Sequence, residues 1–370
     1  MFPSHLIRHP ESLFFFWKAR VALHTLLEAL DVGPGDEVIM PAFTCVVVPN
    51  AILYRGASPI YADIDPDTFN ISAESVESLI TPRTRVILAQ NTFGLSPDLD
   101  PIMSLAERHG IIVIDDCAHG LGAGYKGQPA GMVAHAAIYS LQWSKPVSTG
   151  LGGFAYIRDK DLAQKVSVLM DSMPYPGLAE QAILAAQISV RPLARYTPIY
   201  YGLVAAYRFL TQRLNLRVGS SVHAELSSID MPPRYALRMA PFQNRLFFHR
   251  LRNLEHRLVG RKEAADGYDR YFSRKSIQLP ARPGYAEHGM LRYSIRVRDK
   301  DAVLRKARKF HIPLGDWFVS PLHPVQDDLS LWRYKKGQCP TAEKACQETI
   351  NILTDVPLST RQLDLLFGSD

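Results

Sequence analysis

Short apolar segments with strand character alternate with amphipathic segments through the first half of the chain. We expect strands over residues 37–40, 59–62, 85–89, 111–114 and 136–140, each bounded by turn residues. We expect helices over residues 14–30, 47–54, 72–80 and 100–109. A sixth strand at 153–157 could run antiparallel to the others. This alternation is typical of a doubly wound α/β domain, in which ligands bind beyond the carboxyl ends of the strands.

The pattern changes after residue 160. Residues 160–235 are mostly helical in character and rich in Ala, Leu and Tyr, and residues 245–272 read as one long, basic, amphipathic helix. A strand over 291–297 and a helix over 299–309 follow. These segments indicate a smaller α+β domain at the C-terminus.

Two domains suit the 370 residues of the chain, since a domain takes about 150 residues. We place a large α/β domain at 1–240, with a helical insertion over about 165–235. The small C-terminal α+β domain occupies 241–370.

Composition narrows the class of protein. The hydrophobic share is 47% and the charged share 21%, which excludes a disordered, collagen-like or coiled-coil chain. The net charge of +6 is too modest to indicate nucleic-acid binding, so no nucleic-acid partner is expected, although it could favour anionic small molecules or an acidic membrane surface.

The cysteines and apolar runs bear on the compartment. The four cysteines are too scattered for a disulfide scaffold or a zinc ribbon, and no metal site is expected. Reduced thiols fit a cytoplasmic protein. The apolar, charge-free segment at residues 40–54 contains two prolines and is shorter than the ~18–20 residues that span a bilayer. We therefore expect a cytoplasmic protein.

Two acidic residues, Asp115 and Asp116, come directly after the predicted strand 111–114. A carboxylate at that end of a strand faces the ligand crevice and could pair with a cationic ligand atom. The alternative is a structural role as a helix cap or a turn residue.

A lysine, Lys145, follows the predicted strand that ends at Ser140, and Gly150, Gly152 and Gly153 come soon after. Burial would lower the pKa of this lysine and free its amine to attack a carbonyl, as in a Schiff-base lysine. The alternative is a solvated surface lysine. Pyridoxal 5′-phosphate (PLP) needs a lysine, an acid for its ring nitrogen and a phosphate cradle. Lys145, Asp116 and Ser140 supply all three types in the expected order.

With these residues in place, the chain resembles the sugar aminotransferases of the DegT/DnrJ/EryC1/StrS family over nearly its whole length. The resemblance rests on the segments "PAFTCVVVPNAI", "GASPIYADIDPDTFNI", "HGIIVIDDCAHGLGAGYKG", "SLQWSKPVSTGLGG" and "PTAEKACQETINILTDVPLS". It implies a fold-type I PLP-transferase, with a three-layer large domain like that of aspartate aminotransferase around a mostly parallel sheet.

The resemblance also implies residue roles. Lys145 would bind PLP covalently through its amine and then act as the general acid and base. Asp116 would keep the pyridine nitrogen protonated, and Ser140 would bind the phosphate. His119 stands where the family usually has a glutamine near the ring oxygen; the alternative for it is a structural histidine.

Four further positions near the cofactor depart from the family pattern. Ala19 and Arg20 replace the usual Gly-Thr at the first helix, where backbone N–H groups would still bind phosphate and Arg20 could add a charge-assisted contact. Cys45 replaces the aromatic residue that often covers the ring. Ala236 replaces an asparagine that reaches the phosphate of the partner subunit, whereas Arg238 is kept.

By resemblance, the protein is a PLP-dependent aminotransferase that moves an amino group from an amino acid, by family habit glutamate, to a nucleotide-linked keto sugar. Such reactions serve cell-surface polysaccharide or secondary-metabolite biosynthesis, and the family implies a homodimer with shared active sites. Two alternatives stay open. One is an enzyme of the same fold acting on a non-sugar keto or amino compound, and the other is a non-catalytic PLP-binding protein.

Two further segments have a functional and a structural interpretation. Residues 191–217 hold tyrosines among apolar residues, with arginines around them. This segment could rest on an anionic membrane or pack on a protein surface. Trp317 and residues 321–324 could line the substrate mouth or serve the fold alone.

Overall fold

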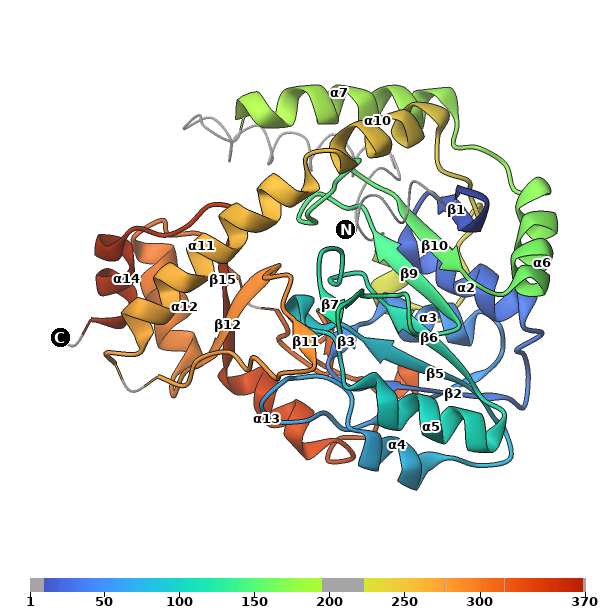
Figure 1. Ribbon diagram of the computed structural model, residues 1–370, viewed down its shortest axis with the longest axis horizontal. Coiled ribbons are helices and arrows are strands. Elements are labelled where there is room, and N and C mark those ends of the chain that lie inside the picture. Colours follow the sequence, from blue (N-terminus) through green and yellow to red (C-terminus); the bar gives the residue numbers. More distant parts are fainter. Residues whose placement is uncertain (1–9, 195–222, 276, 316, 369–370) are drawn as a thin grey trace.

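The fold is built on a seven-stranded sheet in a computed structural model that describes residues 10–194, 223–275, 277–315 and 317–368 (Figure 1). In the order of their pairing, the strands are β1 (Leu13–Phe16), β10 (Gly153–Ile157), β9 (Ala136–Ser140), β6 (Ile112–Asp116), β5 (Thr84–Gln90), β2 (Glu37–Pro41) and β4 (Ser58–Ala62). The strands from β9 to β4 are parallel, whereas β10 runs antiparallel to both of its neighbours, β9 and β1. This confirms the mostly parallel sheet and the antiparallel sixth strand.

Helices cover both faces of this sheet. The helices of the first 200 residues are α2 (Ala19–Ala29), α3 (Val47–Leu53), α4 (Ala73–Leu79), α5 (Leu99–His109), α6 (Lys160–Asp171) and α7 (Leu178–Ala194). Side chains alternate along each strand, so Val38 and Met40 of β2 pack with α2, α3 and α6, whereas Ile39 packs with α4 and α5. The large domain therefore has the three layers that the sequence predicts.

Local signals set the ends of several helices. The Ser72 side chain accepts a hydrogen bond from the backbone N–H of Ser75 and caps α4. Gly110 closes α5 with a φ of 66°, a left-handed conformation that favours glycine. Both helices lie where the sequence predicts them.

The prediction of one helix over residues 14–30 is wrong in its first part. Leu13–Phe16 form the edge strand β1, which pairs with β10, and α2 begins only at Ala19. The Phe15 ring packs edge-on against Phe247, 5.3 Å between ring centroids. A run of aromatic residues suits a strand as well as a helix, and pairing with β10 decides between them here.

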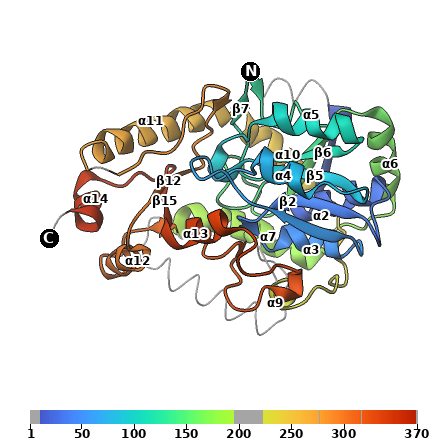
Figure 2. The ribbon, with the colours of Figure 1, turned by 90° about the horizontal axis from the view of Figure 1, so that it is seen from below.

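A second, three-stranded antiparallel sheet forms the core of the C-terminal part. It consists of β12 (Arg292–Arg296), β15 (Thr349–Leu353) and β13 (Leu314–Gly315). The helices of the second half are α9 (His223–Ser227), α10 (Pro241–Leu251), α11 (Leu254–Phe272), α12 (Lys300–Lys309), α13 (Pro340–Glu348) and α14 (Thr360–Phe367). Figures 1 and 2 both show α12, α14 and the later part of α11 gathered around this sheet, whereas α11 begins beside the large domain.

The prediction of one helix over residues 245–272 is also wrong, because the chain forms α10 and α11 with a break at Arg252 and Asn253. Phe247 of α10 packs with β9 and β10, whereas Tyr268 of α11 packs with β12 and β15. Leu254 and Leu258, after the break, still pack in the core of β9 and β10, so the change to the second core comes inside α11, between Leu258 and Ala264.

Segments beyond residue 240 also take part in the large core. Trp332, Cys339, Ala342 and Cys346 pack in the same cluster as α2 and α3. The domain boundary at 240 stays a prediction. Residues on both sides of it contribute to one hydrophobic core, which a simple division of the chain does not imply.

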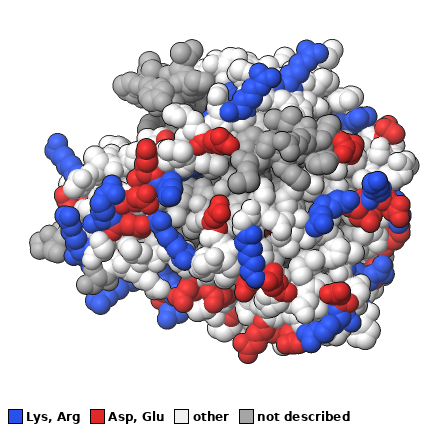
Figure 3. All heavy atoms as spheres, in the orientation of Figure 1, with Lys and Arg blue, Asp and Glu red and all other residues white. Residues whose placement is uncertain are grey.

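Short elements complete the described structure. They are the strands β3 (Thr44–Cys45), β7 (Gly124–Tyr125), β8 (Gln128–Pro129), β11 (Ala286–Glu287) and β14 (Leu322–His323), and the 3₁₀-helices η1 (Pro10–Ser12), η2 (Thr92–Gly94) and η3 (Ser330–Trp332). Among the described residues, none of the helices is long and apolar enough to cross a bilayer. Acidic and basic side chains are intermixed over the face shown in Figure 3.

Candidate active site

The predicted site residues gather at the carboxyl ends of the central strands. Asp116 is the last residue of β6, and Ser140 is the last residue of β9. Lys145 lies in the loop that leads from β9 to β10, where its backbone N–H donates to the carbonyl of Gln142, 3.0 Å away. The alternation of strands and helices therefore brings these three side chains to one edge of the sheet, as expected for this topology.

Lys145 is a buried lysine rather than a surface one, since only 9% of it is exposed. Burial lowers the pKa of its amine to about 7, and the positive charge of Arg292 acts in the same direction. Asp116 opposes this shift. A large share of the Lys145 amine is therefore neutral near pH 7 and able to act as a nucleophile or a base.

Asp116 is equally enclosed. Its carboxylate accepts a hydrogen bond from the backbone N–H of Ala118, 2.9 Å away. Burial raises the pKa of this carboxyl, whereas the Ala118 bond and the Lys145 charge lower it. Asp116 and Lys145 therefore interact electrostatically inside one low-dielectric site.

The neighbouring Asp115 points to the opposite face of β6, because side chains alternate along a strand. Its carboxylate accepts from the side-chain amide of Asn91 at 2.5 Å and from the backbone N–H of Gly131 at 2.8 Å. Burial raises its pKa to about 7. Asp115 is therefore a structural residue, and Asp116 alone faces Lys145.

His119 stacks on Trp317, with ring centroids 5.1 Å apart and an angle of 12° between the planes. The Nδ1 atom of His119 accepts from the backbone N–H of Phe93 at 3.3 Å. Burial lowers the pKa of His119 well below its usual range, with Lys145 and Arg292 adding to the shift. The imidazole is neutral and carries its proton on Nε2, which leaves one donor for a ligand.

Helix α2 begins beside the same edge of the sheet. Ala19 packs so closely on β10 that a Cβ atom at Gly153 would lie 2.4 Å from the Ala19 Cα. This close approach brings the N-terminus of α2 next to Ser140, which pairs with Gly153. Backbone N–H groups at a helix N-terminus suit an anion.

Arg20 makes a buried ion pair that the sequence analysis missed. Its Nη1 atom lies 2.5 Å from Oε1 of Glu225 in α9, and the amine of Lys18 lies 3.5 Å from the other carboxylate oxygen. The carbonyl of Glu225 accepts from the side-chain amide of Asn50 in α3, at 2.7 Å. Figure 2 shows α9 near α3. A carboxylate therefore sits against the cations at the start of α2.

Cys45 belongs to the same cluster. It lies in β3, which pairs with β14 so that Cys45 is opposite His323. Burial raises the pKa of the Cys45 thiol, and the charges of Arg20 and Lys145 oppose that shift. The thiol is therefore a small neutral group between the start of α2 and Lys145.

The structure places Arg238 elsewhere. It forms a β-bridge with Phe16 beside β1, and its guanidinium lies over the ring of Tyr175, 5.1 Å from the centroid. Arg238 is thus at the antiparallel edge of the large sheet, whereas Asp116 and Lys145 lie at its parallel centre. Within one subunit, the structure does not bring Arg238 to the other predicted site residues.

Trp317 and Arg292 close the site from the C-terminal part of the chain. The Lys145 amine lies 5.2 Å from the Trp317 ring centroid, and the Arg292 guanidinium lies 4.9 Å from it. The Trp317 carbonyl accepts from the side chain of Asn351 at 2.7 Å. Sequence analysis raised Trp317 as a mouth residue but missed Arg292, whose only signal is an arginine within an otherwise buried strand.

The predicted membrane or protein contact over residues 191–217 cannot be placed, because most of that segment lies outside the described residues. Residues 321–324, the other predicted mouth segment, hold β14 beside β3. The Thr44 N–H donates to the Pro321 carbonyl at 3.0 Å. Because Thr44 and Cys45 form β3, this bond places residues 321–324 beside Cys45.

Comparison with known proteins gives a consistent result. The model of the DegT/DnrJ/EryC1/StrS aminotransferase family matches residues 18–181 and 214–367. GDP-perosamine synthase of Caulobacter vibrioides is 43% identical over 148 residues, a match that spans 40% of each chain. A protein of Geobacillus stearothermophilus named pleiotropic regulatory protein is 31% identical over 90% of this chain and 76% of its own.

Solved structures share the whole fold. The structure of a Streptococcus pneumoniae protein in its PLP form matches with a TM-score of 0.75 over 99% of this chain and 89% of that one, at 21% sequence identity. The fold is therefore that of proteins which hold PLP, although the sequences have diverged widely.

Proposed function

This chain belongs to the DegT/DnrJ/EryC1/StrS aminotransferase family, and we propose that it transfers an amino group from an amino acid to a keto sugar. The observation that carries the proposal is the buried Lys145, with a pKa of about 7, interacting with Asp116 at the carboxyl edge of a parallel sheet. Glutamate is the donor that family habit favours.

The donor set fits PLP. A neutral buried amine, a carboxylate, a hydroxyl and a helix N-terminus lie together, which are the groups that the aldehyde, the ring nitrogen and the phosphate require. Lys145 would hold the aldehyde carbon, Asp116 the ring nitrogen and His119 the ring oxygen. When bound, PLP supplies an electron-accepting ring that stabilises negative charge at the α-carbon of the donor.

The residues of the chain supply orientation and proton transfer. The neutral Lys145 amine would take the proton from the donor α-carbon and give it up again within the first half of the reaction. In the second half it would act in the reverse direction and deliver a proton to the acceptor carbon. Asp116 keeps its negative charge next to the ring nitrogen and so keeps that nitrogen protonated. Burial lowers the pKa of Lys145 and so favours the unprotonated base. Burial raises the pKa of Asp116, so the ionised carboxylate depends on the Ala118 hydrogen bond and on the positive charge beside it.

Ser140, the first N–H groups of α2 and Arg20 would bind the phosphate. Arg20 is already paired with Glu225, so it would be shared between an internal carboxylate and the phosphate. Such sharing keeps the buried guanidinium neutralised when the phosphate is absent.

The acceptor site lies on the C-terminal side, where Trp317 covers Lys145. An aromatic ring suits the apolar face of a sugar, and the excess of basic residues suits a nucleotide diphosphate. Support for a nucleotide sugar comes from the match with GDP-perosamine synthase. The pathway would be the synthesis of a surface polysaccharide or a secondary metabolite.

The working form would be a cytoplasmic homodimer in which Arg238 reaches the phosphate of the partner subunit. The position of Arg238, away from its own Lys145 and next to the half-exposed Tyr175, supports this arrangement.

The test is to load the protein with PLP, reduce it with borohydride and identify the modified residue by mass spectrometry. We expect modification at Lys145 in the parent and in a Lys126→Ala control, and none in Lys145→Ala. The absorption of the loaded protein should change on adding glutamate, and amino sugar should form from a nucleotide-linked keto sugar. Modification elsewhere, or no change with any amino acid, would refute the proposal.

A further inference from the structure

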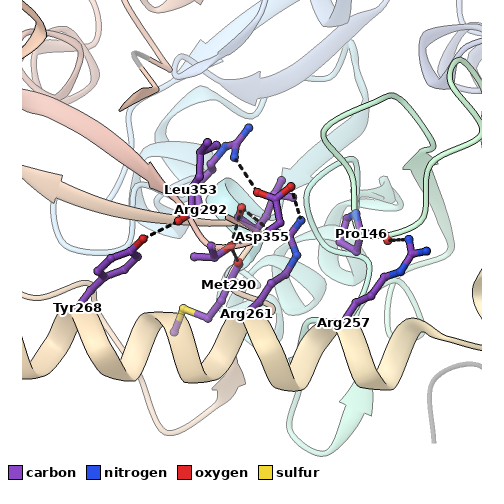
Figure 4. Close-up of polar contacts among 10 residues, drawn as sticks. Pro146, Arg257, Arg261, Tyr268, Met290, Arg292, Leu353 and Asp355 are labelled. Carbon is purple, nitrogen blue, oxygen red and sulfur yellow. Dashed lines mark hydrogen bonds and ion pairs between the residues drawn. The ribbon is translucent and has the colours of Figure 1, made fainter. Parts of the chain in front are cut away.

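The loop that carries Lys145 is held by side chains from α10 and α11. Arg257 donates to the carbonyl of Pro146 at 2.9 Å, as Figure 4 shows, and Arg250 donates to the carbonyl of Ser148 at 2.5 Å. Gln243 donates to the carbonyl of Leu151 at 2.8 Å. Three polar side chains thus bind three carbonyls of the loop, and of these Arg257 binds the one nearest to Lys145.

Arg261 lies one helical turn beyond Arg257, and residues four apart share a helix face. The Arg261 guanidinium donates to the carbonyl of Leu291 at 3.0 Å and to the hydroxyl of Thr354 at 2.7 Å. It also lies 3.8 Å from Asp355.

Asp355 in turn lies 3.9 Å from Arg292, the strand residue that stacks on Trp317. Figure 4 shows Arg257 pointing to the lysine loop and Arg261 pointing to this group, from the same helix. One face of α11 therefore contacts both sides of the active site, the loop after β9 and the sheet of the C-terminal part.

We propose that Arg257 is a positioning residue that fixes the backbone next to Lys145 and, through α11, fixes Lys145 relative to Arg292 and Trp317. The bonded carbonyl belongs to the residue directly after Lys145, so the bond restrains the backbone one residue away from the lysine. Without this bond the loop gains freedom, and the amine gains contact with water. This inference rests on the proposed function of Lys145.

The charged and titratable groups that face Lys145 come from four elements. They are Asp116 on β6, Cys45 on β3, Arg261 on α11 and Arg292 on β12, with His119 close by. Those groups act on Lys145 through their charges, whereas Arg257 acts on it through the backbone carbonyl of Pro146. Variants of Arg257 that keep or remove its charge therefore separate the effect of Arg257 from the effects of those groups.

The experiment measures how fast acetic anhydride modifies Lys145 in the full chain freed of cofactor, as a function of pH, by mass spectrometry. Arg257→Met removes the hydrogen bond and the charge, whereas Arg257→Lys keeps a charged donor. Arg252→Met, an exposed arginine at the break before α11, is the control. We expect Arg257→Met to raise the midpoint by about one pH unit, which lowers the rate at pH 7 about five-fold.

Rescue and steady-state kinetics complete the test. Arg257→Lys should restore the midpoint at least in part, and the control should match the parent. In the PLP-loaded enzyme, kcat should fall about ten-fold in Arg257→Met, with little change in the KM for the amino donor. A parent-like midpoint in Arg257→Met, with a parent-like circular dichroism spectrum, would overturn the inference. Because the labelling needs no substrate, its result does not depend on whether a keto sugar is the acceptor.

Discussion

The carboxylate of Glu225 lies 2.5 Å from the guanidinium of Arg20, although 205 residues separate them in the chain. Both side chains are almost fully buried. The pair places an internal anion at the N-terminus of α2, where the cofactor phosphate is proposed to bind.

Glu225→Gln should destabilise the cofactor-free protein by about 3–5 kcal/mol, because it leaves a buried guanidinium without its carboxylate. Urea unfolding measures this. Inorganic phosphate should then stabilise the variant more than the parent, since the anion can pair with Arg20. As a control, Glu77→Gln breaks an exposed ion pair with Arg108 and should cost less than about 1 kcal/mol. Equal stabilisation of variant and parent by phosphate would argue against an anion site at Arg20.

The reactivity of Lys145 should depend on pH in the neutral range. The amine is reactive when unprotonated, and its pKa is about 7, so modification by acetic anhydride should rise with pH and reach half its maximum near pH 7. Lys126 provides an internal control, because its bond to Asp100 raises the pKa of that exposed amine. If both lysines became reactive over the same pH range, the burial argument for Lys145 would fail.

Asp116→Asn should lower the pKa of Lys145 further, by about one unit, because the Asp116 carboxylate is the main group that raises this pKa. In the loaded enzyme, kcat should fall about 10²–10³-fold, as for other losses of a charge aimed at the reacting system. The labelling profile and steady-state kinetics measure the two effects separately. Asp161→Asn, on α6, serves as the control. An unchanged kcat would show that Asp116 does not take part in the reaction.

Trp317→Ala should raise the pKa of Lys145 by about one unit, since burial is the main cause of its depression. Trp317→Phe keeps an aromatic cover and should stay close to the parent. Acylation profiles measure this, and Phe310→Ala, which removes a ring lying against the exposed Lys309, is the control. A parent-like profile in Trp317→Ala would show that other residues exclude water from the amine.

A mixture of two inactive variants should recover activity if Arg238 works across a subunit interface. The Lys145→Ala variant lacks the lysine of its own site, and the Arg238→Ala variant lacks the arginine that would act in the partner's site. A hybrid dimer of the two therefore contains one site with both residues intact. After unfolding and refolding together, about a quarter of the parental activity should return. Absence of recovery, with a dimer confirmed by light scattering, would mean that Arg238 does not act in the partner's site.

The sequence predicts the sheet and its central residues well, for a physical reason. Buried parallel strands are short apolar runs, so the position of Asp116 and Ser140 at their ends can be read from the chain, and Lys145 follows from the next loop. Glu225 and Arg292 could not be found in this way. Each reaches the site from a distant segment, and the local pattern around it carries no sign of the contact.

The errors in the helices have a similar cause. Residues 14–16 form a strand because they pair with β10. The break at Arg252 separates two helices whose adjoining ends pack on the same core, and periodicity along the chain contains neither piece of information. Tertiary packing overrides the local pattern at both places.

The return of Trp332 and α13 to the interior formed by α2 and α3 has a practical consequence. A fragment that stopped at residue 240 would expose the apolar side chains of α2 and α3 that Trp332 and α13 cover, and the complementary fragment would expose Trp332 itself. Neither fragment would fold as an independent domain. Exchanging C-terminal parts between relatives to change substrate choice would therefore require redesign of the packing between α13 and the helices α2 and α3.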